Sequence, residues 1–316
     1  MTRIAAVVPS LGASPVADEA LAALRRELAA YPGPSELVWV QQGGLSAPPL
    51  EGADERLVAL PAPAGFAAAV DRGYETANPE SELLLVMNDD LVLEPGWLAT
   101  LVALLGQTPG AGAVQGQNLR LADPARTDGC GLAWNRDWQA VQLRDGEAPL
   151  PGDAAPFEIF GVSATAALYR TSALAAAAGA GGSPFDRRLG SYYEDVELAV
   201  RLRQAGFASY CLPAARALHA GQATSRRAPR DRWRLVYRNR RWVVASLLGA
   251  RLASERARIE RRDRRDLLRR LAGLDFAAVA GILDGLREAR RAAPPFAGDR
   301  QRALAAAERL TVGSAA

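Results

Sequence analysis

The amino-acid sequence predicts an α/β fold, with a mostly parallel, Rossmann-like sheet covered by helices on both faces and a helical carboxy-terminal extension. Over the first hundred residues, short runs that are apolar throughout alternate with segments of helical spacing. Such runs are typical of strands in a parallel sheet that is buried on both faces. Hydrophobic residues make up 49% of the 316 residues and charged residues 23%, which fits a globular chain with a sizeable core.

Four strands and two helices are expected in the first ninety residues. Phe66, Val70 and Tyr74 recur every four residues and indicate the second helix. In a doubly wound sheet, ligands lie beyond the carboxyl ends of the strands, so the residues that follow the strands are the first candidates for a site. The expected strands are 4–8, 36–40, 56–60 and 83–87, and the expected helices are 18–28 and 66–76.

The rest of the chain has an irregular middle and a helical end. Residues 107–160 are rich in glycine, proline and aspartate with scattered strand signals, and this composition predicts an irregular segment. Beyond Arg226 the pattern is helical as far as Pro294. We therefore expect a domain at 1–245 and a basic helical extension at 246–316. Other expected elements are strands at 91–93, 164–169 and 209–212, the last ended by Pro213, and helices at 97–105, 170–178 and 194–205.

Charge is distributed unevenly along the chain. All 38 basic residues are arginine, and the net charge is only +3. Residues 1–225 carry 15 arginines against 25 acidic residues, whereas residues 226–316 carry 23 against 10. Such a basic end either meets an anionic partner, such as a membrane surface, or forms a solvated helical face. Nucleic acid is the least favoured partner, because almost no aromatic residues accompany the arginines past Trp242.

Cysteine usage and apolar runs indicate a cytoplasmic protein. Cys130 and Cys211 form no CxxC pair and no ligand cluster, so neither a disulfide framework nor a zinc site is expected. The amino terminus leads straight into the first strand without a signal-peptide pattern. No apolar run approaches the ~20 residues that a membrane helix needs. We expect a cytoplasmic location, at most peripheral at the inner face of the cell membrane.

Asn88, Asp89 and Asp90 directly follow the apolar strand expected at 83–87. Two carboxylates at the carboxyl end of a buried parallel strand face the ligand crevice, where oxygen ligands suit a Mg²⁺ or Mn²⁺ ion that bridges a diphosphate. The plainer interpretation is a polar turn that closes the strand. His219, the only histidine, follows another expected strand, as a metal ligand would, although a lone histidine more often has a structural role.

Glu194 and Asp195 begin the helix expected at 194–205, after two tyrosines. Acidic residues in a first helical turn are also favoured by the helix dipole alone. Asp195, however, precedes Leu198 and Ala199 by three and four residues, so it points to the buried side of the helix. A carboxylate in that position can act as a general base.

In their order and spacing, these residues resemble the family-2 glycosyltransferases of the GT-A fold, over roughly residues 3–245. The most specific match is the stretch from Glu194 to Phe207, and within the family the chain is most similar to bacterial rhamnosyltransferase-type members. The other matching segments are 4–10, 65–73, 85–90, 95–97, Phe185-Asp186, His219 and 237–240.

The resemblance implies roles for individual residues. Asp195 would be the catalytic base, and Glu194 beside it would position the acceptor. Asp90 and His219 would hold Mn²⁺ or Mg²⁺, and Asp89 would help to hold the metal or the ribose. The implied donor-binding residues are Pro9, Gln41, Asp71, Asn88 and Asp89.

The activity implied by the resemblance is inverting transfer of a sugar from a nucleotide-diphosphate donor to an acceptor hydroxyl. The donor would be dTDP-rhamnose or a UDP-sugar, and the acceptor a saccharide or lipid-linked molecule in cell-surface polysaccharide or glycolipid synthesis. The chain departs from the family at the end of the second strand, where an Asp that reads the donor base is replaced within Gln41-Gln42-Gly43-Gly44. A glutamine amide can still pair with a base edge, because it carries both a donor and an acceptor.

Two other functions are weighed against this one. A nucleotidyltransferase is disfavoured, because the first strand leads into Pro9-Ser10-Leu11-Gly12 and not into a glycine-rich loop that carries arginine and lysine. A catalytically silent scaffold is favoured by the altered Gln41-Gln42 and disfavoured by the intact Asp90, Asp195 and His219. The extension would dock on an anionic membrane, pack on the catalytic domain or pair in a homodimer.

Overall fold

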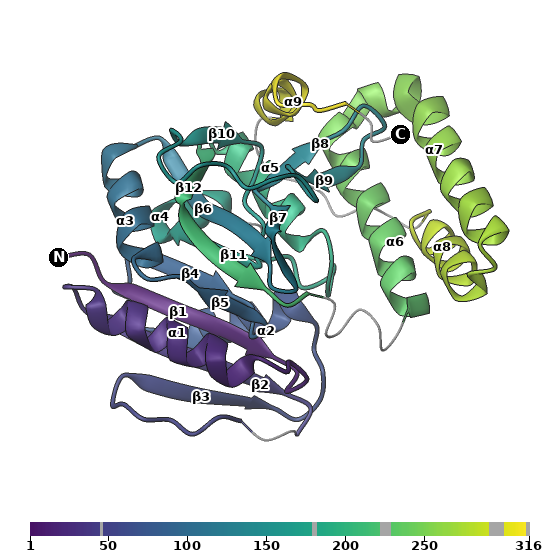
Figure 1. Cartoon of the computed structure of the whole chain (residues 1–316). Helices are drawn as coiled ribbons and strands as arrows, with labels where there is room; N and C mark the ends of the chain where they lie inside the picture. The colour runs from purple at the N-terminus through teal and green to yellow at the C-terminus, as the bar shows by residue number, and fades with distance from the viewer. Residues whose placement is uncertain (45–46, 179–181, 222–228, 291–299, 314–316) are drawn as a thin grey trace.

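The computed structural model describes residues 1–44, 47–178, 182–221, 229–290 and 300–313, and it confirms the mixed α/β fold with a helical carboxy-terminal part. The described strands include a 10-stranded sheet whose main path runs β10-β12-β6-β11-β4-β1-β2-β3. Figure 1 shows the helices of the chain's last third beside this sheet. The amino-terminal strands therefore form one side of the sheet, and strands from the middle of the chain form the other.

The amino-terminal half of the sheet is parallel, as expected. β1 pairs in parallel with β2 on one side and with β4 on the other, and β3 extends the sheet beyond β2. Every residue of β1 and β4 is buried, which explains why these runs are apolar throughout. The bounds are β1 Ile4–Ser10, β2 Ser35–Gln42, β3 Glu55–Leu60 and β4 Leu83–Met87.

The other half of the sheet is mixed. β11 (Ala166–Arg170) lies antiparallel between β4 and β6 (Ala111–Arg120), and β12 (Ala208–His219) runs parallel to β6. Shorter strands pair at the margins of these long ones. They are β5 Leu91–Leu93, β7 Asp123–Gly129 and β10 Phe157–Ile159, and a separate two-stranded sheet consists of β8 Leu132–Trp134 and β9 Ala140–Gln142.

Helices cover both faces of the sheet, and each face has its own apolar core. α1 (Ala17–Ala30) and α3 (Trp97–Gln107) pack on one face. α2 (Phe66–Thr76), α4 (Thr171–Ala177) and α5 (Glu194–Gln204) pack on the other. The expected helices are thus present, and the sheet is buried between them.

The expectation of an irregular segment at 107–160 is wrong, because this stretch supplies the buried strand β6. Its glutamines are satisfied by neighbouring main chain: Gln115 Oε1 accepts from the Ser163 nitrogen at 2.7 Å, and Gln117 Nε2 donates to the Pro213 oxygen at 2.8 Å. Gly116 lets β12 approach, since a Cβ at this position would lie 2.0 Å from the Ala215 oxygen. Glycine, which contributed to the prediction of an irregular segment, is a strand residue here.

The short strand expected at 209–212 is also wrong in length, because β12 continues to His219. Pro213 does not end it, since the register against β6 shifts between Leu212 and Arg216. At such a bulge, the missing N–H of a proline breaks no ladder hydrogen bond. The longer strand places His219 opposite Leu91 of β5, next to Asp90.

The carboxy-terminal helices pack on the rest of the chain. α8 lies close against α6, because a Cβ on Gly281 or Gly285 would come within 2.2 or 2.3 Å of main-chain oxygens of α6. The buried Asp263 of α7 pairs with Arg240 and Arg241 of α6. α9 joins α5 in a third apolar core. The bounds are α6 Pro229–Leu248, η1 Gly249–Arg251, α7 Leu252–Ala272, α8 Phe276–Glu288 and α9 Arg300–Arg309.

Within the five described ranges, no helix combines the length and the apolar character that a membrane span requires.

Candidate active site

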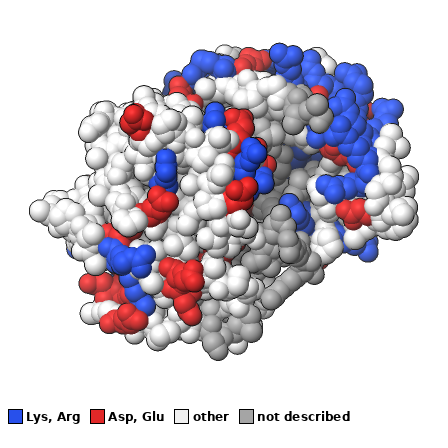
Figure 2. Space-filling model, in the orientation of Figure 1, with Lys and Arg blue, Asp and Glu red and all other residues white. Residues whose placement is uncertain are grey.

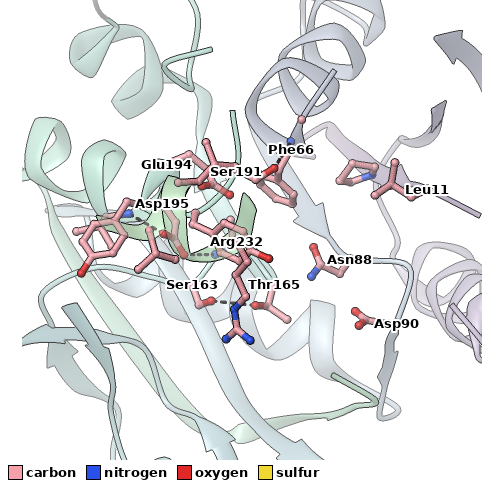
Figure 3. Close-up of a pocket in the computed structure, with 18 of the residues that line it drawn as sticks. Leu11, Phe66, Asn88, Asp90, Ser163, Thr165, Ser191, Glu194, Asp195 and Arg232 are labelled. Carbon is pink, nitrogen blue, oxygen red and sulfur yellow. Dashed lines mark hydrogen bonds between the residues drawn. The ribbon is translucent and has the colours of Figure 1, made fainter. Parts of the chain in front are cut away.

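A cavity of about 560 Å³ lies beyond the carboxyl ends of β1, β2 and β4. Its walls come from the loop after β4, the start of α5 and the start of α6. Figure 3 shows Glu194 and Asp195 on one side of this cavity and Asn88 and Asp90 on the other. Of the predicted site residues, the structure brings Pro9, Asn88, Asp89, Asp90, Glu194 and Asp195 together in its walls.

Asp89 is held by Ser10, the last residue of β1. Ser10 Oγ donates to Asp89 Oδ2 at 2.5 Å and in turn accepts from the Gly12 nitrogen at 2.9 Å. Burial and the neighbouring Asp90 charge raise the pKa of Asp89 to about 6, although the Ser10 hydroxyl opposes this shift. The strand ends β1 and β4 are adjacent in the sheet, which is why these side chains meet.

Asp90 and His219 meet at the end of the longer β12. Asp90 Oδ1 lies 3.2 Å from His219 Nε2, yet both atoms are buried and neither makes a hydrogen bond. On the other side of the imidazole, Nδ1 donates to Asp128 Oδ2 at 2.8 Å. Burial lowers the pKa of His219, but the Asp128 and Asp90 carboxylates outweigh it and raise the pKa to about 10.

This arrangement fits a divalent cation. Two cis ligands at about 2.1 Å from a Mg²⁺ ion are themselves about 3.0 Å apart, close to the observed separation of Asp90 Oδ1 and His219 Nε2. Asp128 fixes the imidazole so that Nε2 faces Asp90. A carboxylate on the other ring nitrogen is a usual partner of a metal-binding histidine. The described residues contain no cluster of three or more such ligands, so the remaining ligands would be water and substrate oxygens.

Glu194 and Asp195 share the first turn of α5. Asp195 Oδ1 accepts from the Val196 nitrogen at 2.8 Å, and Oδ2 faces the Ala164 nitrogen at 3.4 Å. Burial raises the pKa of Asp195 to about 6. Burial and the nearby Asp195 charge raise the pKa of Glu194 well above its ordinary value, and Glu194 Oε2 has no hydrogen-bond partner within the described chain. Near neutral pH, Asp195 is therefore the carboxylate that can accept a proton.

The loop before α5 is held in an uncommon conformation. Tyr192 and Tyr193 both have positive φ angles, 68° and 69°, which non-glycine residues adopt rarely. Asn239 Nδ2 donates to the main-chain oxygens of Leu189, Ser191 and Tyr192 at 2.9, 3.0 and 2.7 Å. A side chain of α6 thus stabilises the backbone that directs Glu194 and Asp195 into the cavity.

Arg232 of α6 places a cation in the cavity wall, as Figure 3 shows. Its guanidinium lies over the Trp233 ring, 5.5 Å from the centroid, and its Nε is buried without a hydrogen bond. None of the carboxylates in the described part of the chain forms an ion pair with it. An unpaired arginine in a cavity of this kind suits an anionic ligand.

Two predicted donor-binding residues lie outside the cavity. Asp71 is fully buried in α2, where it accepts from the Phe185 nitrogen at 3.0 Å and from Arg187 Nε at 2.9 Å, so it holds the chain before α5. Gln41 is buried and accepts from Trp39 Nε1 at 3.2 Å. Because side chains alternate along a strand, Gln42 is the residue of β2 that faces the cavity.

Three residues of this site carried no assigned role in the sequence. Asp128 lies in the segment that was expected to be irregular and is 91 residues away from its partner His219. Arg232 stands among many arginines of the basic end, with nothing in the sequence to distinguish it. Asn239 was part of a matching segment, but only the folded chain shows which carbonyl groups it contacts.

The sheet, the acid-lined cavity at its carboxyl edge and the basic side chain of α6 define a GT-A-type fold with a site suited to an anionic donor. The chain belongs to the glycosyltransferase like family 2, whose model matches residues 2–245. No curated protein matches the chain by sequence.

Two solved structures illustrate the likeness in fold. One is the crystal structure of GalNAc-T7 with UDP, GalNAc and Mn²⁺, at 13% identity and a TM-score of 0.56, covering 78% of this chain and 48% of that one. The other is the mannosyltransferase PcManGT from Pyrobaculum calidifontis in complex with GDP-Man and Mn²⁺, at 16% identity and a TM-score of 0.51, covering 90% and 86%. The chain thus spans about half the length of GalNAc-T7. At these identities the likeness concerns the fold.

Proposed function

We propose that this chain is an inverting, metal-dependent glycosyltransferase that moves a sugar from a nucleoside-diphosphate donor to an acceptor hydroxyl. The observation that supports it most directly is the placement of Asp195 on the opposite side of one cavity from Asp90. A base on one side and a site for the leaving diphosphate on the other is what a single displacement requires. The family, the UDP and GalNAc bound in the GalNAc-T7 structure and the GDP-Man bound in PcManGT agree with a nucleotide-sugar donor.

On the donor side, Pro9 and Gln42 would contact the nucleoside, and Asp89 would accept from the ribose hydroxyls. Gln42 takes the place proposed for Gln41, because Gln42 is the one that faces the cavity. The donor we propose is dTDP-rhamnose or a UDP-sugar. A Mn²⁺ or Mg²⁺ ion between Asp90 and His219 would neutralise the charge that develops on the departing diphosphate.

The protein's own contribution is to position and deprotonate the acceptor. Asp195 receives the proton of the acceptor hydroxyl as that oxygen attacks the anomeric carbon from the side opposite to the diphosphate. Burial favours the protonated form of Glu194, and its Oε2 has no hydrogen-bond partner among the described residues, so Glu194 can donate to the acceptor. Arg232 contributes a positive charge close to the departing group. A single displacement with one base inverts the anomeric configuration.

Hydrolysis of a panel of nucleotide sugars in the presence of Mn²⁺ tests this proposal. We expect slow release of nucleoside diphosphate from one donor, loss of release in excess chelator and faster release when a suitable acceptor hydroxyl is added. A catalytically silent scaffold would bind donors without releasing nucleoside diphosphate. A nucleotidyltransferase would release pyrophosphate from a nucleoside triphosphate instead.

We also propose that the end of α7 and the start of α8 dock on an anionic membrane. Four large apolar side chains are exposed there and a fifth lies further along α8, which together are most of the exposed large apolar side chains of the described residues. Figure 2 shows basic side chains crowded over the region where α7 lies in Figure 1. The end of α7 and the start of α8 thus form an apolar tip, which can insert between lipid headgroups while the basic side chains beside it are attracted to anionic lipid. Such docking would bring the enzyme to glycolipid or lipid-linked acceptors. The exposed residues are Leu268, Leu271, Leu274, Phe276 and Leu283.

A further inference from the structure

A second cavity, of about 490 Å³, lies between α6 and α7. Ala140, Tyr193 and Val236 line both this cavity and the active-site cavity, so the two adjoin. Tyr193 is the residue that precedes the Glu194–Asp195 pair. The second cavity therefore borders the active site on the side of the proposed base.

The walls of the second cavity are strongly basic. Arg240, Arg262, Arg269 and Arg270 line it, and Asp266 is the only acidic residue among its described walls. This excess of positive charge favours an anionic ligand, provided that acidic side chains do not already neutralise the arginines.

Two of the four arginines are already neutralised. Arg240 is paired with the buried Asp263. Arg262 Nε donates to Asp266 Oδ2 at 3.0 Å, and the same oxygen accepts from Tyr237 Oη at 2.7 Å and from Gln139 Nε2 at 3.1 Å. Oδ2 of Asp266 is thus saturated by donors of the cavity wall, and no ion pair among the described residues joins Asp266 to Arg269 or Arg270.

The other two arginines are paired less closely or not at all. Arg270 lies over the Trp233 ring, 4.4 Å from the centroid, and its ion pair with Asp275 is long at 3.4 Å. Arg269 is exposed and forms no ion pair with any described residue. Two guanidinium groups that line one cavity, one of them oriented by an aromatic ring, offer N–H donors of the kind that bind phosphate oxygens.

We infer that this second cavity is the acceptor subsite for a phosphate group. The inference rests on the proposed function, because it is the base two residues beyond Tyr193 of the shared wall that makes this the acceptor side. An acceptor whose phosphate contacts Arg269 and Arg270 would extend past Tyr193 and place a hydroxyl near Asp195. The phosphate could belong to a lipid-linked acceptor or to a free phosphosugar, and the same two arginines would bind either.

Binding measurements on the full-length protein test this subsite. The donor site is first filled with Mn²⁺ and a saturating mixture of UDP, dTDP and GDP, so that a second phosphate cannot bind there. Two phosphate probes, farnesyl phosphate and a hexose 1-phosphate, are then titrated by calorimetry and compared with farnesol and the free hexose. Tighter binding of farnesyl phosphate than of farnesol indicates the lipid source, and tighter binding of the hexose 1-phosphate than of the hexose indicates the free sugar.

Arg269→Ala/Arg270→Ala is the variant, and Arg261→Ala/Arg264→Ala on the outer face of α7 is its matched control. Because hydrogen bonds to charged groups are the stronger kind, we expect the first variant to weaken the bound phosphate probe about tenfold or more, and the control less than about twofold. A similar thermal midpoint in all three proteins shows that folding is unchanged. The inference is overturned if no phosphate probe binds, if neutral probes bind as well, or if the first variant binds normally.

Failure of the subsite and failure of the enzyme are distinguishable. If the donor panel shows transfer while Arg269→Ala/Arg270→Ala binds phosphate normally, only the subsite is wrong. If no donor is turned over but the phosphate probe still depends on these two arginines, the anion site stands, and its assignment to an acceptor is overturned together with the proposed function.

Discussion

Asn239 Nδ2 lies 2.7 Å from the main-chain oxygen of Tyr192, a residue held at a φ of 68°. The same amide reaches the oxygens of Leu189 and Ser191, so one side chain of α6 holds the whole turn that leads into α5. Backbone in such a conformation persists only where its surroundings hold it, and it is common at active sites. By this contact α6 controls the direction of the Glu194 and Asp195 carboxylates at the start of α5.

Replacing Asn239 should reduce turnover more than donor binding. Asn239→Ala removes the donor, and Asn239→Asp sets a charge against three carbonyl oxygens, so we expect kcat to fall about tenfold or more in the first variant and further in the second. Steady-state kinetics and nucleoside-diphosphate binding measure the two effects. Asn78→Ala, beyond the end of α2, is the control. Full turnover by Asn239→Ala would show that the turn does not depend on this amide.

Asp195 and Glu194 should respond differently to near-isosteric substitution. Asp195→Asn removes the proton acceptor, and base catalysis contributes typically 10²–10⁴-fold, so we expect less than about a hundredth of normal turnover with donor binding retained. Burial and the Asp195 charge raise the pKa of Glu194 and so favour its protonated form, which glutamine resembles, and Glu194→Gln should therefore stay within about tenfold of the unaltered protein. Single-turnover assays compare the two. More than about a tenth of normal turnover in Asp195→Asn would remove it from the role of base.

The pH dependence of turnover follows from the same pair. The active form of Asp195 is the carboxylate, and burial raises its pKa to about 6. Turnover should therefore be at its full value above this pH and fall about tenfold per pH unit below it, because the base becomes protonated. Asp195→Asn should lose this acidic limb, whereas Glu194→Gln should keep it. An acidic limb that persists in Asp195→Asn would belong to another group.

Removal of the cation ligands should weaken Mn²⁺ binding. Asp90→Ala and His219→Ala each remove one of two protein ligands, and Asp128→Asn removes the outer carboxylate that orients the imidazole, a change that typically costs 10–100-fold in metal affinity. Mn²⁺ binding followed by electron paramagnetic resonance measures this without turnover. Asp145→Asn, an exposed acid in the loop that follows β9, is the control. Undiminished Mn²⁺ affinity in both Asp90→Ala and His219→Ala would contradict the assignment.

Membrane docking should depend on the exposed apolar tip and on salt. Each arginine near an anionic surface contributes about 1 kcal/mol, and salt screens it over about 8–10 Å, so binding should be reversible and weaker at high salt. Leu274→Ser/Phe276→Ser should float poorly with anionic vesicles, whereas Leu57→Ser on β3 should float normally. Equal flotation of all variants would contradict membrane docking and leave the tip with a structural role. Concentration-dependent pairing of two chains through this tip would indicate a dimer interface instead.

The first hundred residues of this fold could be predicted from the sequence because local pattern and tertiary environment agree there. The run Leu83–Met87 is apolar because both faces of β4 are buried, and the residues after it had to lie at the sheet's edge. Asp195 could be assigned to the buried side of its helix from spacing alone.

The features that could not be predicted from the sequence depend on residues that are distant in sequence and close in the fold. β6 contains glutamines whose hydrogen bonds include the distant main chain of residues 150, 163 and 213. Asp128 gains its role only because β7 and β12 lie beside β6 on its two edges. Likewise, the sequence does not show that Arg269 forms no ion pair with a described residue, because the fold decides which acidic side chains lie near each arginine.

The anomeric configuration of the sugar first released from the donor tests the central claim most directly. Proton nuclear magnetic resonance, recorded on the unaltered protein with Mn²⁺ before the free sugar mutarotates, reads this configuration even when water is the acceptor. A single displacement with Asp195 as base predicts that the first-formed sugar has the configuration opposite to that of the donor. First-formed sugar with the donor's own configuration would contradict the proposed mechanism.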